Sequence, residues 1–559
     1  MRNYLNKTAR YLITAAATIV LIICIISLSQ NWNKKTPVLD YEAASKKIDS
    51  YYSKLKVNKL ALKQDPNFEG VDSDAEKVAV LPDISEYPFI VNPSTDNFLT
   101  IYASAEKREW LIEIGNRFNT SGATIDGMPV SVSIRSMPSS LGADFISSGK
   151  YTPDLFSPSS EIYGEMIIGK GVNAALVEKR IAGNVTGIAI NRKKGDDIAM
   201  KYGPIDFSVI AKAVLNGDLA LGYTSPLSNE DGFNFVLALL LDADSENPTS
   251  PAAVEHLRKV QDRILLIAYD EDQLRASLTG GALDAIVINS QAYANAPNIY
   301  QAFEFIALGQ RSDSPVYEIG ELTELKKGIA ELFTSFCKTP ESQASATDKG
   351  FNSYEAYATP ASVSGLAINQ AQEIYKNEKG GSSVITAVFV ADISGSMEGS
   401  PLLNLKASLS RAAGVISSDA NIGLVTFSDD VNIALPIAKF DNNQRSYFSS
   451  AVKSMSAAGG TAMFDAIVVA QKMLLDAKML NPNTKLMLFV LSDGESNRGL
   501  RFGDIEAAAY GTKIPIYTIG YNANIEVLSS LSAINEAAAM NADSDNVIYR
   551  LESLFNSQM

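Results

Sequence analysis

The stretch Val384–Met397 reads VITAVFVADISGSM and decides the fold expected for the C-terminal part of the chain. Its run Ile385–Ala391 is short, apolar and rich in β-branched residues, which is typical of a strand buried on both faces of a parallel sheet. The carboxyl end of such a strand opens on the crevice where doubly wound α/β sheets bind ligands. There Asp392, Ser394 and Ser396 offer hard oxygen atoms, which suit a hard cation such as Mg²⁺. The stretch therefore predicts a strand with a metal site at its tip.

Two later loops extend this pattern. Thr461 lies in AAGGTAMFDA just before a helical stretch, and Asp493 lies in LMLFVLSDGES at the end of a second apolar run, Leu486–Leu491. Together with the DxSxS of the first strand, they resemble the von Willebrand factor A (VWA) family, whose metal-ion-dependent adhesion site (MIDAS) has DxSxS, a distant Thr and a distant Asp. The alternative is a metal-free Rossmann-like domain in which the same residue types cap helices and turns.

The resemblance implies a metal site formed by Asp392, Ser394, Ser396, Thr461 and Asp493. It also implies that Mg²⁺, or Mn²⁺ or Ca²⁺ in its place, is the cofactor. In the family the serines and sometimes the threonine bind the metal directly, while the aspartates act largely through water. One metal position is then left for an Asp or Glu carboxylate of a protein partner, so the site is a recognition device.

We do not expect an enzyme. The site implies no nucleophile or general base, and the one histidine, His256, lies far away in the sequence. A metal-dependent phosphatase of the haloacid dehalogenase type also carries an aspartate at this strand tip. That family needs DxDx[TV], however, and Ser394 stands where its second carboxylate, the general acid, is required. The sequence contains no P-loop, G-x-S-x-G or H-E-x-x-H motif.

Length and charge limit the class of protein. The 559 residues predict about three to four domains, and the content of 46% hydrophobic and 20% charged residues is that of globular protein. The net charge of -15 argues against nucleic acid or an anionic membrane surface as the main partner. The two cysteines, Cys24 and Cys337, are not expected to form a disulfide, because Cys24 lies in the apolar N-terminal run.

That N-terminal run predicts a membrane anchor. Arg2, Lys7 and Arg10 precede the uncharged segment Tyr11–Ser29, which is just long enough to cross a bilayer. We expect residues 1–35 to form a cytoplasmic tail and a signal-anchor transmembrane helix, about 11–29. The protein is then a single-pass protein of the cell membrane, with its N-terminus cytoplasmic and the bulk of the chain extracellular, in a bacterium-like setting. The alternative is a cleaved signal peptide.

Residues 36–94 are predicted to form a stalk helix and a linker. Tyr41, Ile48, Leu55 and Leu62 recur every seven residues, which favours an amphipathic helix that packs on its own protein. The following residues, 64–94, contain four prolines and many acidic residues, and they indicate an irregular linker.

From Asn97 onward, predicted strands alternate with helices, and each strand ends in small hydroxyl residues. Such turns place backbone N–H groups and hydroxyls around a receptor for a small anionic or zwitterionic ligand. The alternative for each serine is helix capping. The serines concerned are Ser104, Ser136, Ser139, Ser140, Ser157, Ser159 and Ser160.

Later stretches, among them VTGIAINRK, GDLALGYTSPLSNEDGFNFVLALLL, GALDAIVINSQAY and LKKGIAELFTSFCKTPESQASATDKGF, resemble type II bacterial extracellular solute-binding proteins. The resemblance implies a two-lobed, periplasmic-binding-protein-like domain over 95–375. Its first lobe covers 97–185 plus 305–371, and its second lobe covers about 186–304. Arg135 is a candidate receptor for a carboxylate or phosphate, with a surface ion pair as the alternative. By position, the other cleft residues are Ser104, Ser136, Ser157, Tyr223, Thr224, Ser225 and Tyr293.

Residues 376–383 include the polar, glycine-rich stretch NEKGGSS and predict a linker into a VWA domain over 384–559. In that domain we expect helices over 401–418, 443–455, 462–479, 504–510 and from 525. The expected strands after the first are ANIGLVTFS, VNIALPIA, LMLFVLSDG, IPIYTIGY and VIYR.

The expected fold is α/β: an N-terminal transmembrane helix, a two-lobed solute-binding-like domain and a doubly wound, Rossmann-like VWA domain. The expected function is that of a membrane-anchored extracellular binding protein, which captures a carboxylate-bearing partner through the VWA metal. The solute-binding-like domain would then sense a small ligand or act as a scaffold. The alternatives are a receptor component of a solute uptake system and an intracellular VWA protein that works with a ring ATPase, which the predicted anchor argues against.

Overall fold

The computed structural model describes residues 39–69, 81–268, 270–279, 281–359, 363–378, 384–521, 525–532 and 539–541. The predicted transmembrane segment, about 11–29, lies outside these ranges, and so does the predicted strand VIYR. Within the described ranges, no helix is both long enough and apolar enough to span a bilayer.

Strand β15 (Ile385–Asp392) is buried along its whole length, as its apolar sequence predicts. It pairs in parallel with β16 (Asn421–Phe427) and with β18 (Lys485–Ser492). The outer strands are β1 (Val57–Lys59), β17 (Val431–Lys439), β19 (Ile516–Gly520) and β20 (Ala539–Asn541). In the described part of the chain the sheet has seven strands in the order β1-β17-β16-β15-β18-β19-β20. Because β15, β16 and β18 are parallel, the loops after them meet at one edge of the sheet.

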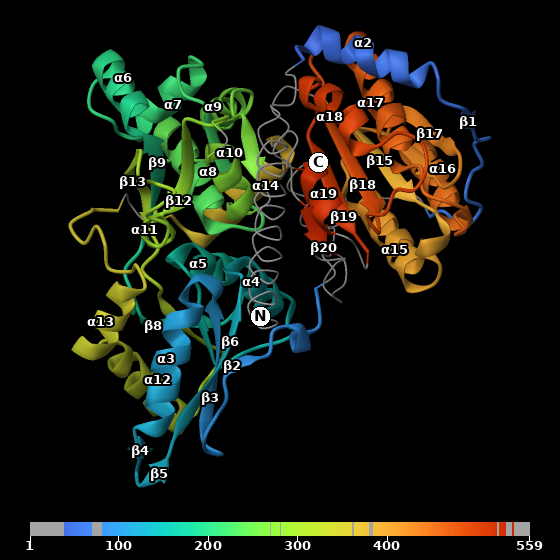
Figure 1. Cartoon of the computed structure of the whole chain (residues 1–559). Helices are drawn as coiled ribbons and strands as arrows, with labels where there is room; N and C mark the ends of the chain where they lie inside the picture. The colour runs from blue at the N-terminus through green and yellow to red at the C-terminus, as the bar shows by residue number, and fades with distance from the viewer. Residues whose placement is uncertain are drawn as a thin grey trace, which may run out of the picture.

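Helices cover both faces of this sheet (Figure 1). On one face, Phe389 and Ala391 pack with side chains of α15 and α16. On the other face, Val388 and Val390 pack with α17, α18 and α19. The helices are α15 (Ser400–Val415), α16 (Asn442–Ser454), α17 (Met463–Leu480), α18 (Phe502–Gly511) and α19 (Ile525–Ser532). Two helical layers around a mostly parallel sheet make this region a doubly wound α/β domain, which confirms the predicted fold of these residues.

The predicted stalk is part of this domain and does not stand free. Helix α2 (Tyr41–Tyr52) lies on α17 and α18, with Ala44 and Ile48 fully buried. The Tyr51 hydroxyl donates a hydrogen bond to the Asp504 carbonyl oxygen at 2.7 Å. Strand β1 then pairs in parallel with β17. Heptad spacing predicted an amphipathic helix, but spacing alone does not say which surface covers the apolar side.

The predicted linker is also held by the folded domains. Asp65 is buried against α16, where its carboxylate accepts hydrogen bonds from Lys453 Nζ at 2.5 Å and from Ser449 Oγ at 2.6 Å. These hydrogen bonds lower the pKa of Asp65 to about 2, and the one from Lys453 has the larger effect. At the far end of the segment, β2 (Phe89–Val91) pairs with a strand of the next domain. Residues 36–94 therefore connect the two folded regions through fixed contacts at both ends.

The region between residues 89 and 378 forms two lobes, each with its own sheet (Figure 1). The first lobe has six strands in the order β2-β6-β3-β7-β14-β8, and the second has five in the order β11-β10-β12-β9-β13, counted over the described residues. The remaining first-lobe strands are β3 (Phe98–Ser104), β6 (Ser131–Met137), β7 (Leu155–Ser157), β8 (Ala174–Glu178) and β14 (Val316–Ile319). Those of the second lobe are β9 (Val185–Asn191), β10 (Leu221–Thr224), β11 (Leu266–Ala268), β12 (Ala285–Asn289) and β13 (Phe303–Arg311).

The lobes also have separate sets of helices. Those of the first lobe are α3 (Arg108–Thr120), α4 (Ser139–Ser148), α5 (Glu161–Gly169), α12 (Glu324–Cys337) and α13 (Pro340–Asp348). Those of the second lobe are α6 (Arg192–Tyr202), α7 (Phe207–Leu215), α8 (Glu230–Ala243), α9 (Pro251–Gln261), α10 (Glu271–Thr279) and α11 (Ser290–Ala294). A last helix, α14 (Gly365–Glu378), packs on α5 of one lobe and on α8 and α9 of the other.

The second lobe extends further along the chain than its predicted end at residue 304. Strand β13 pairs antiparallel with β9 from Phe303 to Arg311, so the chain returns to the first lobe between Arg311 and Val316. The first crossing, between β8 and β9, lies close to the predicted boundary at 185/186. The predicted return of the chain to the first lobe, at residue 304, was too early. The end of β13 depends on its pairing with β9, a strand more than a hundred residues earlier in the chain, which local sequence does not reveal.

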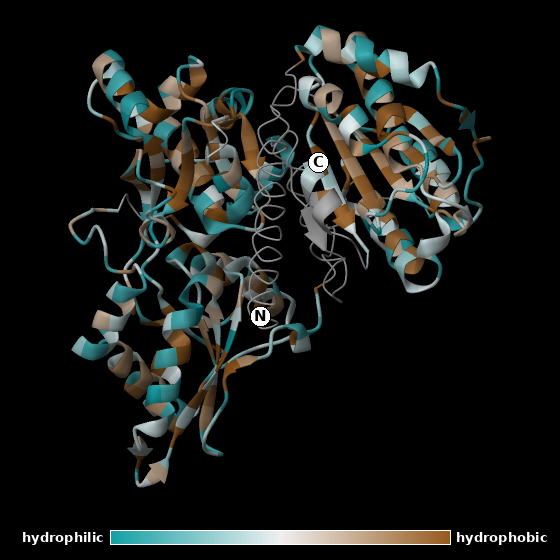
Figure 2. Cartoon of the chain, in the orientation of Figure 1, coloured by the Kyte–Doolittle hydropathy of each residue, from teal (hydrophilic) through white to brown (hydrophobic). Residues whose placement is uncertain are grey.

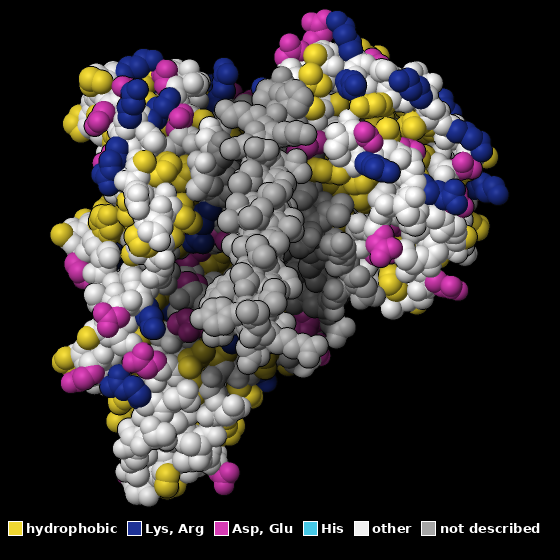
Figure 3. All heavy atoms as spheres, in the orientation of Figure 1, with side chains coloured by type: hydrophobic (Ala, Val, Ile, Leu, Met, Phe, Trp, Pro, Cys, Tyr) yellow, Lys and Arg dark blue, Asp and Glu magenta, His cyan; other side chains and the backbone are white. Residues whose placement is uncertain are grey.

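Hydrophobic residues concentrate in the central strands of the three large sheets, and polar residues lie on the outer helices (Figure 2). On the face drawn in Figure 3, acidic and basic side chains are interspersed over the lobes and the VWA region. The described part of this face therefore has no extended basic area of the kind that nucleic acid requires.

Candidate functional site

The candidate metal site begins with Asp392, the last residue of β15. Its fully buried carboxylate accepts hydrogen bonds from the Ser394 N–H at 2.8 Å and from Ser492 Oγ at 2.6 Å. Burial raises the pKa of Asp392 to about 6, against the lowering effect of these two serines, and the nearby Asp493 raises it further. The buried charge is thus held by neutral donors only.

Two serines follow Asp392 in the same loop. Ser394 Oγ and Ser396 Oγ lie 3.0 Å apart, around the short 3₁₀ turn η3 (Gly395–Met397). Two backbone hydrogen bonds tie this turn to the loop before α17: the Gly395 N–H donates to the Gly459 carbonyl at 3.0 Å, and the Ala458 N–H donates to the Ile393 carbonyl at 2.9 Å. This pairing brings Thr461 beside the DxSxS loop.

Thr461 is joined in turn to the loop after β18. Its N–H donates to Asn497 Oδ1 at 2.9 Å, and its carbonyl accepts the Asn497 N–H at 3.1 Å. Asp493, which directly follows β18, is buried between these loops and accepts the Glu495 N–H at 3.2 Å. The five predicted residues thus come from three loops that are hydrogen-bonded to each other at the carboxyl edge of the sheet.

The donor set fits a hard divalent cation. It contains two carboxylates and three hydroxyls, and all of these oxygen types suit Mg²⁺. Among the described residues, no lysine or arginine pairs with Asp392 or Asp493. Among the described residues, no three or more His, Cys, Asp or Glu side chains are grouped so that they could hold a metal ion.

The DxSxS–Thr–Asp pattern did not identify three neighbouring residues. Ser492 bonds Asp392 directly, and Asn497 fixes the backbone of Thr461. Asp429, in the loop after β16, accepts the Gly460 N–H at 2.9 Å and pairs with Arg498 Nε at 2.6 Å. Ser492 and Asn497 flank Asp493 in SDGESN, so the sequence offered that signal, whereas the position of Asp429 depends on the order of the strands.

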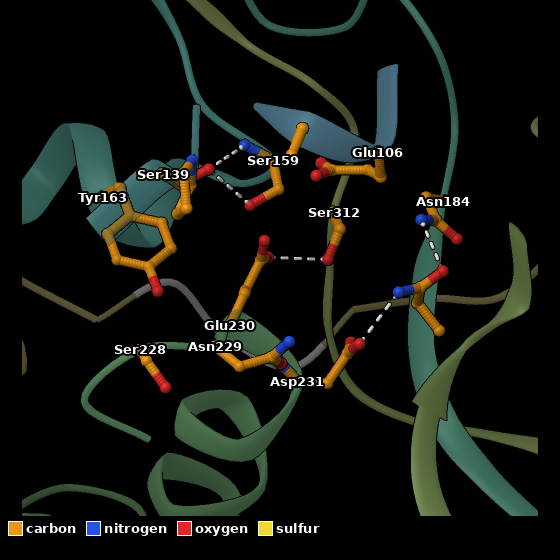
Figure 4. Close-up of a pocket in the computed structure, with 13 residues that line it drawn as sticks. Glu106, Ser139, Ser159, Tyr163, Asn184, Ser228, Asn229, Glu230, Asp231 and Ser312 are labelled. Atoms are coloured by element: carbon orange, nitrogen blue, oxygen red, sulfur yellow. Dashed lines mark hydrogen bonds between the residues drawn. The ribbon is translucent and has the colours of Figure 1, made fainter. Parts of the chain in front are cut away.

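A second candidate site is a cavity of about 200 Å³ between the two lobes. Residues that follow β3 and β7 and that begin α4 line it from the first lobe, and the start of α8 lines it from the second lobe (Figure 4). Of the serines at the predicted strand ends, Ser139 and Ser159 line this cavity, and their hydroxyls lie 3.0 Å apart.

The eight residues predicted for the solute cleft do not line this cavity. Arg135 donates hydrogen bonds to the carbonyl oxygens of Ile84 and Tyr87 and lies over the Phe89 ring, so it serves the packing of β2 and the preceding turn. The surface ion pair that was its alternative is also absent from the described residues.

The other seven predicted cleft residues are buried or engaged elsewhere. Ser157 accepts a hydrogen bond from Lys107 Nζ, the Tyr223 hydroxyl donates to Gln261, and Tyr293 stacks on Tyr300. The remaining four are buried in or next to strands of the two sheets, because the last inward-facing residue of a strand lies in the core below the cleft. They are Ser104, Ser136, Thr224 and Ser225.

Several cavity residues were not predicted. They include three acids, Glu106, Glu230 and Asp231, and the aromatic Tyr163. The signal was present in SNEDG at 228–232, which begins four residues after the end of β10 at Thr224, but the tertiary structure was needed to add Glu106 from the other lobe.

Comparison with known families assigns both the two-lobed region and the C-terminal sheet domain to a family. Residues 387–556 match the family model for the von Willebrand factor type A domain, and residues 99–352 match that for a bacterial extracellular solute-binding protein. The chain therefore contains a VWA domain and a solute-binding domain, as the two resemblances predict. No curated protein matches the chain.

Solved structures resemble one region or the other. A von Willebrand factor type A protein from Catenulispora acidiphila is 17% identical, with 31% of this chain and 42% of that chain covered and a TM-score of 0.29. The sulfate-binding protein SubI from Mycobacterium tuberculosis is 16% identical over 51% of this chain and 96% of that chain, with a TM-score of 0.34. Iron-bound HitA from Pseudomonas aeruginosa is 14% identical, with 51% of this chain and 99% of that chain covered and a TM-score of 0.37. The two domain assignments support an extracellular binding role.

Proposed function

For a chain that joins a solute-binding domain to a VWA domain, we propose capture of a protein partner through a divalent cation at the VWA sheet edge. The observation that carries the proposal is the environment of Asp392. Its carboxylate is fully buried, lies close to a second carboxylate, Asp493, and has only neutral hydrogen-bond donors. A buried charge without a counter-charge is costly, and a bound cation would offset that cost.

Each residue has a distinct part in this proposal. Ser394, Ser396 and Thr461 would hold the ion through their hydroxyl oxygens, while Asp392 and Asp493 would supply the negative charge. Ser492 and Asn497 would keep the carboxylate and the Thr461 backbone in place. When bound, the metal supplies an open coordination position that a partner's Asp or Glu carboxylate occupies. We therefore propose a binding protein and not an enzyme, since this capture breaks no covalent bond.

The rest of the chain would place this site outside the cell. Residues 11–29 would anchor it in the membrane, with the N-terminus cytoplasmic, and the solute-binding domain would sense a small ligand or serve as a scaffold. The alternative, a receptor that delivers solute to an uptake system, is less favoured because this domain is fused to a VWA domain, on which α2 packs.

Capture of a partner tests the metal site directly. Full-length protein on intact cells is cross-linked and recovered with Mg²⁺ or with EDTA. We expect a partner band with Mg²⁺ that is lost with EDTA and in the Asp392→Ala and Thr461→Ala variants. Asp419→Asn, an exposed acid of the same domain, is the matched control and should behave as wild type. A partner recovered equally well in EDTA and in both site variants would refute metal-bridged capture.

Protease treatment of intact cells tests the location. Cleavage of residues 384–559 from outside is expected, while a cytoplasmic marker protein stays intact. Protection of this region on intact cells, with cleavage only after lysis, would favour the intracellular alternative.

A further inference from the structure

The cavity between the lobes is lined by acids from both of them. Glu106 lies in the short turn η2 (Ala105–Lys107) after β3, and Glu230 and Asp231 lie in the first turn of α8. The lining contains no lysine, arginine or histidine. Figure 4 shows the Glu106 carboxylate on one side of the cavity and that of Glu230 on the other.

The buried cation that follows Glu106 in the chain, Lys107, senses the charges of Glu106 and Glu230 but forms no ion pair with either in the described residues. Lys107 is fully buried, and its Nζ donates three hydrogen bonds of 2.8 Å, to Ser157 O, Ser157 Oγ and Pro158 O. Its donors are thus fully used on the far side of η2. In the described residues, neither Glu106 nor Glu230 forms an ion pair.

The two acids of α8 differ in their exposure. Asp231 is only 4% exposed and accepts hydrogen bonds from Thr186 Oγ1 at 2.6 Å and from Asn289 Nδ2 at 2.8 Å, one on each carboxylate oxygen. Glu230 interacts with the hydroxyls of Ser312, at 2.7 Å, and of Ser160, and its side chain is partly exposed beside the cavity. Asp231 therefore has a structural role, and Glu230 can be reached by a ligand.

Tyr163 gives an independent sign of a ligand. It is only 2% exposed, yet its hydroxyl forms no hydrogen bond with the described residues. In Figure 4 this hydroxyl points into the cavity, toward the side where Glu230 and Ser228 lie. A buried phenol normally finds a partner, and its oxygen can accept a hydrogen bond from a ligand donor.

An anion is disfavoured at this place. The first turn of α8 attracts negative charge, but Glu230 and Asp231 already supply it from within the helix. Burial raises the pKa of Glu230 to about 8 and that of Asp231 to about 6, with Glu106 adding to both shifts. An ionised carboxylate here thus lacks a counter-charge, which a cation would supply and an anion would not.

The chemistry of the lining selects between kinds of cation. Among the described residues, no three His, Cys, Asp or Glu side chains are grouped so that they could hold a metal ion, in this cavity or elsewhere. The lining instead combines separate carboxylates with hydroxyl and amide oxygens around a cavity of about 200 Å³. Such acceptors, with an aromatic ring beside them, suit the three N–H donors of an alkylammonium group.

We propose that the cavity between the lobes binds a small organic cation with a primary ammonium group, held by Glu230 and Glu106 and by the Tyr163 hydroxyl. This assignment replaces the anionic or zwitterionic ligand expected from the serine-rich strand ends. It is independent of the metal site in the VWA domain.

Thermal unfolding and calorimetric titration of the full chain test the proposal. The probes are 1,4-diaminobutane and n-butylamine, with 1,4-butanediol as the neutral analogue, and sulfate, phosphate and glycine as anionic and zwitterionic probes. Buffers contain EDTA, to silence the VWA site, and about 0.15 M salt, to screen attraction to the acidic surface. We expect the amines to bind and to raise the melting temperature of the solute-binding domain, and the other probes to have no effect.

Variants locate the binding. Glu230→Gln and Glu106→Gln should each weaken amine binding roughly tenfold or more, because each removes a charge-assisted hydrogen bond. Tyr163→Phe should weaken it a few-fold. Glu109→Gln, an exposed acid of α3, is the matched control and should leave the affinity unchanged.

Other outcomes overturn the proposal. Amine affinity that is equal in wild type, Glu230→Gln and Glu106→Gln would place binding on the surface. Binding of sulfate, phosphate or glycine without amine binding would restore the anionic or zwitterionic ligand. In a parallel titration without EDTA, stabilisation of the Asp392→Ala variant by Mg²⁺ or Mn²⁺, with no amine effect, would mean a metal cavity. Silence of both amines at millimolar concentration would also refute it.

Discussion

The VWA sheet edge and the cavity between the lobes both gather carboxylates and hydroxyls at the ends of strands, but they are assembled in different ways. The first lies within one sheet, where three loops are fixed to each other by backbone hydrogen bonds. The second has acids from two lobes, Glu106 from one and Glu230 from the other. A site within one sheet has fixed geometry, whereas a site between lobes depends on how the lobes sit relative to each other.

The largest expected effect separates the two sites by their ligands. With Mg²⁺ at about a hundred times its Kd, wild-type VWA unfolding should shift upward by about 5–10 °C. Asp392→Ala should abolish this shift and keep the amine response of the cavity, while Glu230→Gln should do the reverse. Differential scanning calorimetry in each ligand measures both. If one variant removed both responses, the sites would be coupled and the comparison would fail.

The next largest effect concerns the wall of the cavity. Gly232 lies in the first turn of α8, and a Cβ there would be 1.7 Å from the Thr224 carbonyl oxygen. Gly232→Ala should therefore destabilise the solute-binding domain by about 3 kcal/mol and leave VWA unfolding unchanged. Gly414→Ala, in α15, is the matched control, because its Cβ meets no atom within 4 Å. Calorimetry that shows the two variants equally stable would contradict the close packing of α8 on β10.

A third change tests whether the predicted stalk belongs to the VWA domain. Ile48 is fully buried between α2 and the helices of that domain, so Ile48→Ala should lower the free energy of VWA unfolding by about 2–5 kcal/mol. Leu62→Ala is the control, since Leu62 is 44% exposed. Chemical denaturation followed domain by domain measures the difference. An unchanged VWA midpoint in Ile48→Ala would return the segment to a free stalk.

The smallest expected effect is a pH dependence of the solute-binding domain. The folded-state pKa values of Glu230, about 8, and Asp231, about 6, lie above the usual values of 4.5 and 3.8. Between pH 5 and 8 the folded state therefore holds protons that the unfolded state has lost, so stability should fall as the pH rises. Glu106 and Tyr163 face these groups. Burial lowers the pKa of Lys107 to about 8. Lys107 therefore makes stability rise with pH, but only above about pH 8.

Melting curves at pH 5.5, 7 and 8, recorded in EDTA, check this sign. Glu230→Gln should flatten the profile, since the substituted amide does not titrate. An amine should flatten it too, because the ammonium group favours the ionised carboxylate. A wild-type melting temperature that rose from pH 5.5 to 8 would contradict the burial of Glu230.

The sequence predicted the VWA site more completely than the solute cavity, and the reason lies in the spacing of the residues. Asp392, Ser394 and Ser396 are fixed to one strand end, and parallel pairing of β15 with β18 brings Asp493 to the same edge. In the solute-binding domain the serines at strand ends were identified, but Ser104 and Ser136 lie in the core, and Glu106, one turn further on, lines the cavity. A shift of a few residues decides which side chain faces the cleft, and periodicity does not resolve it.

By itself, the sequence determined the α/β class, the order of the two domains, the buried strand β15 and the five oxygen-bearing residues at one sheet edge. These follow from local patterns: apolar runs, their length and the polar residues directly after them. The tertiary structure alone decided that α2 covers the VWA sheet, that the second lobe extends to Arg311 and that the cavity is acidic. Each of these depends on contacts between residues far apart in the chain, where packing and burial select among arrangements that local sequence permits equally.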